Sequence, residues 1–164
     1  MGNTTTGADA RGGGVYAGGP ITITASTVGD NITTGLRASG GGIAAGADVT
    51  VVGSTISGNR TTGYYASGGG VYAALGMEIA VRLTNSTVSG NTTEAPNAAG
   101  GGIFAQNVRI EGSTVTGNSA RRFGGIIADE LTLSGSIIAG NTAELDYSEW
   151  RAFRRHECQP LPDW

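Results

Sequence analysis

Apolar and polar residues alternate along most of this chain. In the segment from Val81 to Ser89, for example, Val81, Leu83 and Val88 are separated by polar residues. Side chains of a β-strand point alternately to its two faces, whereas a helix repeats its apolar positions every three or four residues. The pattern therefore predicts short strands with one buried face.

The alternating segments are copies of one unit, which begins with a glycine pair followed by Val or Ile and closes with an asparagine. The closing residues are Asn31, Asn59, Asn91, Asn118 and Asn141, at steps of 28, 32, 27 and 23 residues. Periods of this size are typical of repeat architectures. The apolar positions keep their place within the unit: one column contains Ile21, Val49, Val81, Val108 and Leu131, and a second contains Ile23, Val51, Leu83, Ile110 and Leu133.

A unit this short cannot bury its apolar face alone, so it must stack on its neighbours. We predict about three short strands per unit, each pairing in parallel with its own copy at a spacing of about 4.8 Å. Five coils would then form a rod of roughly 24 Å. Stacking would place apolar residues inside, glycines at a tight bend and the asparagines in an amide ladder.

Two motifs of the unit resemble a known family. Gly68-Gly69-Gly70-Val71-Tyr72-Ala73 and Ser86-Thr87-Val88-Ser89-Gly90-Asn91 are similar to repeats of right-handed parallel β-helices of the pectin-lyase-like superfamily, and in particular to those of bacterial surface proteins and polymorphic outer-membrane adhesins. The resemblance covers about residues 2–143. It implies an all-β, right-handed parallel β-helix of about five coils and a secreted or cell-surface location, but it leaves the activity open because this fold serves lyases, hydrolases, adhesins and stalks.

The repeat pattern stops after Ala143. We therefore divide the chain into a parallel β-helix, residues 1–143, and a C-terminal tail, residues 144–164. The charged segment 144–155 could form a short helix in which Leu145, Trp150 and Phe153 close the end of the rod, as the caps of repeat proteins do. Alternatively, the tail is disordered or unrelated to the repeat.

Charge narrows the range of partners. The chain has a net charge of −3, with ten Arg and no Lys, and no basic run that could follow a phosphate backbone, so we predict no nucleic-acid partner.

No segment is long enough to span a membrane, and no apolar leader stands at the N-terminus. Asn3 stands 28 residues before Asn31, as the end of an earlier coil would, so we interpret the chain as a fragment or a shortened reading frame. Uncapped coils would allow end-to-end association.

Binding is expected on the variable segments between the repeats. The loops 32–39, 60–67 and 92–99 follow the closing asparagines, and a second variable site includes 74–80. Tyr64 and Tyr65 are the best candidates for an exposed ligand contact, with packing of the loop over the sheet as the alternative. Carbohydrate or a host or cell-surface protein is the expected partner.

A second candidate surface is charged. Arg82 and Arg109 are predicted to stack on consecutive coils and to face outward, with Glu111 diagonal to Arg82. These residues could suit a substrate carboxylate, but a solvated salt-bridged patch of little energetic value is the explanation that we favour.

The function that we expect is that of a structural or adhesive β-helix module of a larger secreted or cell-surface bacterial protein. The alternative is an enzyme of this fold, a polysaccharide lyase or glycoside hydrolase, which would need clustered carboxylates. Asp48 and Glu130 share one column but lie on distant coils, so we assign no catalytic residue. His156-Glu157-Cys158 lacks further ligands, so we predict no metal and no cofactor. A second alternative is an ice-binding face, because Thr27, Thr55, Thr87 and Thr114 form an outward column, although Ile137 interrupts it.

Overall fold

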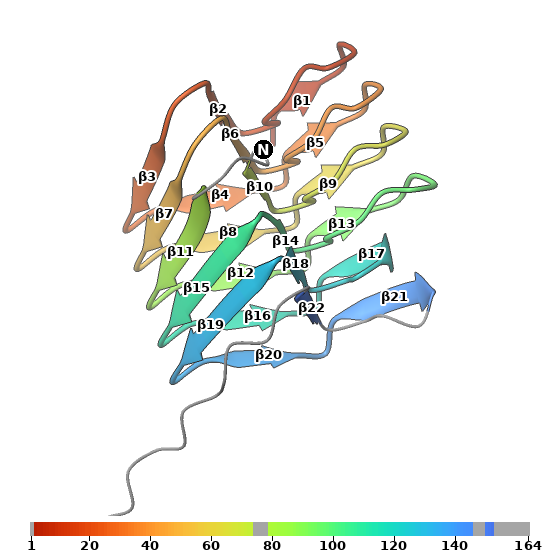
Figure 1. Ribbon diagram of the computed structural model, residues 1–164. Helices are drawn as coiled ribbons and strands as arrows, with labels where there is room; N and C mark the ends of the chain where they lie inside the picture. The colour runs from red at the N-terminus through yellow and green to blue at the C-terminus, as the bar shows by residue number, and fades with distance from the viewer. Residues whose placement is uncertain (1, 74–78, 146–149, 153–164) are drawn as a thin grey trace, which may run out of the picture.

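The computed structural model describes residues 2–73, 79–145 and 150–152, and within these ranges the chain forms strands, turns and bends but no helix. The strands form four sheets, and each strand pairs in parallel with its copies in the neighbouring coils (Figure 1). Each coil contributes one strand to each of the four sheets in turn. The predicted all-β parallel β-helix is confirmed.

Each sheet collects one strand from each coil. Sheet A contains β1 (Thr4–Thr5), β5 (Ile32–Thr33), β9 (Arg60–Thr61), β13 (Thr92–Thr93), β17 (Ser119–Arg122) and β21 (Thr142–Leu145). Sheet B contains β2 (Val15–Ala17), β6 (Ile43–Ala45), β10 (Val71–Ala73), β14 (Ile103–Phe104), β18 (Ile126–Ala128) and β22 (Trp150–Ala152). Sheet C contains β3 (Ile21–Thr24), β7 (Val49–Val52), β11 (Ala80–Thr84), β15 (Asn107–Glu111) and β19 (Glu130–Ser134). Sheet D contains β4 (Thr27–Gly29), β8 (Thr55–Ser57), β12 (Thr87–Ser89), β16 (Thr114–Thr116) and β20 (Ile137–Ala139).

The register of these sheets is the one that the repeats predict. Val88 pairs with Ile56 on one side and with Val115 on the other. The two apolar columns of sheet C also align, and Val51, Leu83 and Ile110 are almost completely buried. The core is therefore a set of aliphatic ladders between the sheets, and burial of these ladders supplies the main stabilisation of the stack.

The buried asparagines form the predicted amide ladder. In one step of it, the backbone N–H and Nδ2 of Asn59 donate to Oδ1 of Asn91 at 3.0 and 2.9 Å, and Asn59 Nδ2 also donates to the carbonyl of Val28. A serine ladder runs parallel to it, in which each backbone N–H donates to the hydroxyl one coil further along, through Ser26, Ser54, Ser86, Ser113 and Ser136. Both ladders satisfy buried backbone groups at the bends between strands.

Two expectations need correction. Each coil has four strands, not three, because the residues directly after each asparagine pair in sheet A and do not belong to a loop. The inward residues of three of these strands are the polar Thr33, Thr61 and Thr93. The sequence therefore lacks the buried apolar residue by which a strand is usually recognised. In the tail, the described residues are strands and not a helix: β21 ends at Leu145, and β22 continues sheet B by pairing with β18. Phe153 lies outside the described residues.

Candidate functional site

The loops beyond sheet A are stacked β-turns. Hydrogen bonds from the fourth N–H to the first carbonyl, of 3.0 to 3.2 Å, close the turns Gly7–Ala10, Gly35–Ala38, Gly63–Ala66 and Ala95–Ala98. Only the third residue of each turn has a positive φ, between 56° and 64°, and this is the type II arrangement. These turns project along one side of the rod, at the right of Figure 1. Most of each presumed variable loop is thus regular, and the sequence varies chiefly at the two central residues of the turn.

Tyr64 and Tyr65 are the central residues of one such turn. Their side chains are 47% and 55% exposed, and their rings meet edge to face with centroids 4.7 Å apart. The neighbouring turn is tied to them, because the N–H of Arg37 donates to the carbonyl of Tyr64 at 2.9 Å. The backbone therefore holds Arg37 and Tyr65 at the same place on successive coils.

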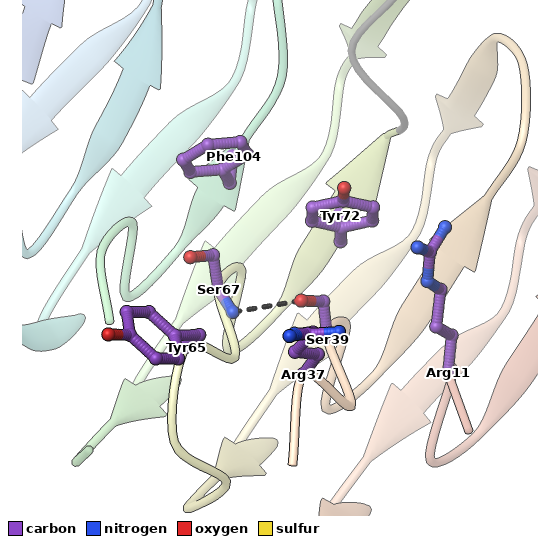
Figure 2. A pocket seen from close by; sticks show the side chains of 7 residues that line it. All are labelled: Arg11, Arg37, Ser39, Tyr65, Ser67, Tyr72 and Phe104. Atoms are coloured by element: carbon purple, nitrogen blue, oxygen red, sulfur yellow. Dashed lines mark hydrogen bonds between the residues drawn. The ribbon is translucent and has the colours of Figure 1, made fainter. Parts of the chain in front are cut away.

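A shallow groove of about 530 Å³ lies between these turns and the outer face of sheet B. Its lining residues are Arg11, Arg37, Ser39, Tyr65, Ser67, Tyr72 and Phe104 (Figure 2). A volume of this size lies within the range of small-molecule sites in proteins. We refer to this feature as the Arg/Tyr groove.

Outward side chains of sheet B form its aromatic wall. Tyr72 and Phe104 are partners in the register of β10 and β14, and their rings stack with centroids 5.6 Å apart and planes 13° apart. The preceding position in the column is Ala44, which leaves room beside Tyr72. The guanidinium carbon of Arg11 lies 5.4 Å from the centroid of the Tyr72 ring, within the range of a cation–π contact.

Serine residues line the groove between this wall and the turns. The N–H of Ser67 donates to the hydroxyl oxygen of Ser39 at 3.0 Å, as the dashed line in Figure 2 marks. Because that hydroxyl accepts the bond, its own hydrogen can be donated to another acceptor. Ser39 is almost buried, so its orientation is fixed by its neighbours.

Most of the described arginines outside the groove form ion pairs, whereas the two arginines of the groove do not. Four described arginines form ion pairs with carboxylates: Arg60 with Glu94, Arg82 with Asp48, Arg109 with Glu111 and Arg121 with Glu144. Arg11 and Arg37 have no carboxylate within 4.0 Å among the residues that the structure describes. The Arg/Tyr groove thus combines two positive charges without an ion-pair partner with aromatic rings and hydroxyls.

The predicted charged patch has a different character. Arg82 and Arg109 do stack in sheet C, but Arg82 pairs with Asp48 at 2.6 Å and Glu111 pairs with Arg109 on its own strand. The N–H of Ala80 and, less strongly, the guanidinium of Arg82 lower the pKa of Asp48. The patch is therefore a set of exposed ion pairs on sheet C, whereas Tyr64 and Tyr65 lie in a turn beyond sheet A, so the five predicted residues do not form one site.

The carboxylates that an enzyme of this fold would need do not come together in the described residues. The column of Asp48 and Glu130 is interrupted by Ala80 and Asn107, as expected. Within the described ranges, no group of three or more His, Cys, Asp and Glu side chains could hold a metal ion, and no helix is long and apolar enough to cross a membrane. The segment 74–78 of the second variable site and His156-Glu157-Cys158 lie outside the described residues.

Our sequence analysis did not identify Arg11, Arg37, Tyr72 or Phe104 as site residues. The repeat register contains the information needed for two of them, because Tyr72 and Phe104 directly follow a buried residue of the sheet B strand and so point outward. The two arginines belong to different columns, and only the stacked turns bring both to one groove. The chain matches no protein-family model, and neither a curated protein nor a solved structure is significantly similar to it.

Proposed function

We propose that this chain is a structural and adhesive module of a larger secreted or cell-surface bacterial protein, with a fold of the pectin-lyase-like type. The observation that carries this proposal is the Arg/Tyr groove, in which two arginines without a carboxylate partner lie beside stacked aromatic rings. Carbohydrate or a cell-surface protein is the proposed partner. The resemblance of the repeats to those of surface adhesins supports the same reading.

The scaffold suits such a role because it is rigid. Each coil is held to the next by four sets of parallel backbone bonds and by the buried asparagine and serine ladders. Residues on a stack of this kind lose little further freedom when a ligand binds, and such preorganisation favours affinity. A stack of coils also spaces its surface residues regularly, which suits extended partners.

Binding of the full chain to immobilised bacterial and host-cell glycans and to intact cells tests the proposal. We expect the wild-type chain to bind a subset of these surfaces and a double variant, Arg11→Ala with Arg37→Ala, to lose most of that binding. Arg60→Ala, which removes one positive charge from an exposed ion pair outside the groove, is the control and should bind normally. Equal binding by the wild type and the double variant would contradict the adhesive role of the groove.

The enzyme alternative is tested on the same preparation. The chain is incubated with acidic polysaccharides in the presence of Ca²⁺, and unsaturated ends are followed by ultraviolet absorbance and reducing ends by a colorimetric assay. We expect neither product. Release of either one at a rate above that of a heat-denatured sample would favour a carbohydrate-active enzyme.

The outward threonines of sheet D support a second candidate, an ice-binding face. Thr27, Thr55, Thr87 and Thr114 are partners in the sheet register. Their hydroxyls and methyl groups repeat at the spacing of the strands, about 4.8 Å. Thermal hysteresis that Thr55→Arg and Thr87→Arg abolish would support this function, and freezing without hysteresis would exclude it.

A further inference from the structure

We propose that the Arg/Tyr groove binds a pyranose ring that carries a single anionic group, sulfate or carboxylate. This inference rests on the proposed adhesive function and names the chemistry of its ligand. Three features of the groove support it: the aromatic wall, the two arginines and the hydroxyls between them.

The aromatic wall fits one face of a sugar. Tyr72 and Phe104 are nearly parallel and come from adjacent coils, so together they present an apolar strip longer than one ring. The C–H bonds on one face of a pyranose form an apolar surface of similar size, and packing them on the rings removes both surfaces from water. Tyr72 and Phe104 are each partly exposed, so this strip is accessible.

The arginines fit an anionic substituent. A guanidinium binds a carboxylate or sulfate through two parallel charge-assisted hydrogen bonds. Arg11 is held over the Tyr72 ring, so its charge stands directly beside the strip on which the sugar would pack. Arg37 enters from the turn side of the groove, and the bond from its N–H to Tyr64 fixes its backbone. Asp9 occupies the turn position one coil before Arg37, but no ion pair joins the two.

The hydroxyls fit the remaining sugar oxygens. The hydroxyl of Ser39 accepts from Ser67 and has a hydrogen of its own to donate, and Tyr65 and Tyr72, which carry phenol hydroxyls, also line the groove. A site that pairs each polar group of its ligand discriminates against analogues that lack one. A single anionic group is favoured over a polyanion such as a nucleic acid, because that ligand needs a longer run of cations than two arginines and the net charge of the chain is −3.

Titration calorimetry of the full chain tests the proposal with three matched sugars: a methyl galactoside 6-sulfate, a methyl galacturonoside and the neutral methyl galactoside. We expect one or both anionic sugars to bind at least about tenfold more tightly than the neutral one, since one charge-assisted pair is worth about a factor of ten. The two anionic sugars distinguish sulfate from carboxylate. Inorganic sulfate alone should bind more weakly than the anionic sugar, because it does not use the rings.

Variants assign the roles of the wall and the charges. Arg11→Ala and Arg37→Ala should each lower affinity for the anionic sugar about tenfold and leave the neutral sugar unaffected. Phe104→Leu keeps an apolar side chain but removes the ring, so it should weaken both sugars. Arg60→Ala should change neither. Circular dichroism and thermal melting of every variant confirm that the fold is retained.

Three results would overturn the ligand assignment. These are equal affinity for neutral and anionic sugars, equal affinity for inorganic sulfate and the anionic sugar, and binding of an acidic peptide with no binding of any sugar. If cells are bound through the groove but none of the three sugars is, the adhesive function stands and this assignment fails. If the chain binds no cell or glycan surface yet binds the anionic sugar, the assignment stands and the adhesive role fails.

Discussion

The asparagine column shows how one buried side chain can replace several backbone contacts. Asn91 is fully buried, and its Oδ1 accepts two hydrogen bonds from Asn59 while its Nδ2 donates to Oδ1 of Asn118 and to the carbonyl of Ile56. An amide is the side chain that can both accept and donate in this way. The ladder therefore depends on having the same residue in every coil.

We predict that Asn91→Ala lowers the free energy of unfolding by about 3 kcal/mol or more, because two buried donors of Asn59 would lose their acceptor at about 1–3 kcal/mol each. Urea denaturation measures the change. Asn3→Ala is the control, since Asn3 is an exposed member of the same ladder and should cost less than about 1 kcal/mol. Similar losses in the two variants would contradict the explanation by burial.

The inward threonines of sheet A present the opposite situation. The hydroxyls of Thr33, Thr61 and Thr93 are buried and have no hydrogen-bond partner among the described residues. Thr61→Val removes such a hydroxyl while keeping the shape, so we expect it to raise stability by about 1 kcal/mol. Thr50→Val, on the outer face of sheet C, should be close to neutral. A loss of stability in Thr61→Val would indicate that its hydroxyl is paired in solution.

At the scale of the element, the bend before each sheet B strand requires glycine for lack of space. A Cβ at Gly69 would lie 2.5 Å from the carbonyl oxygen of Gly101 and 2.6 Å from that of Thr92. These atoms belong to the backbone and cannot move without disturbing the register. The close spacing of the coils thus forbids a side chain at this position.

We expect Gly69→Ala to destabilise the chain by several kcal/mol, on the order of 3 or more, through this overlap. Gly19→Ala is the matched control, because no atom lies within 4 Å of its Cβ position and its φ is ordinary. The control should be neutral or slightly stabilising, since alanine restricts the unfolded chain. Thermal melting of both variants tests the prediction, and equal melting temperatures would refute it.

The ion pairs on sheet C predict a small dependence of stability on pH. The pKa of Asp48 is lowered in the folded chain, chiefly by the N–H of Ala80 and then by Arg82, so ionised Asp48 stabilises the fold at pH values above the ordinary pKa of an aspartate in an unfolded chain. This contribution is lost as the pH falls through the lower folded value. Because both side chains are exposed, we expect Asp48→Asn to cost less than about 1 kcal/mol at pH 7. Melting temperatures at pH 7 and pH 2 check this, and a difference between wild type and variant that is unchanged at pH 2 would contradict it.

For the whole molecule, the sequence was sufficient for the fold because the register repeats. Each residue of a core column, such as Leu83, has a copy at the same place in the next unit, so stacking could be inferred without coordinates. Sheet A was missed because its inward Thr61 looks like a loop residue, and the groove was missed because Arg11 and Tyr72 are two coils apart. Residues at different positions of the repeat come into contact only through the path that the turns take in space. The period of the sequence does not predict that path.

The two ends of the described stack expose apolar residues whose counterparts in the interior coils are buried. Leu133 is 42% exposed, whereas its partners in the interior coils, Leu83 and Ile110, are buried, because no described strand lies beyond β19 in its sheet. At the opposite end, β3 is also an edge strand, and its Ile23 is partly exposed. The two ends present different edges of the same sheets, so copies of the chain can stack head to tail with parallel pairing preserved, and such a contact does not close on itself.

We expect the chain to form linear assemblies whose mean mass rises with concentration in sedimentation velocity experiments. Leu133→Arg places a charge at the contact and should shift the association to concentrations about tenfold higher or more, since burying an unpaired charge is costly. Thr87→Arg, on the outer face of sheet D in the middle of the rod, adds the same charge away from the ends and should leave the association unchanged. A single monomeric species of the wild-type chain at every concentration, or an equal effect of the two variants, would show that the edges of β3 and β19 do not pair between copies.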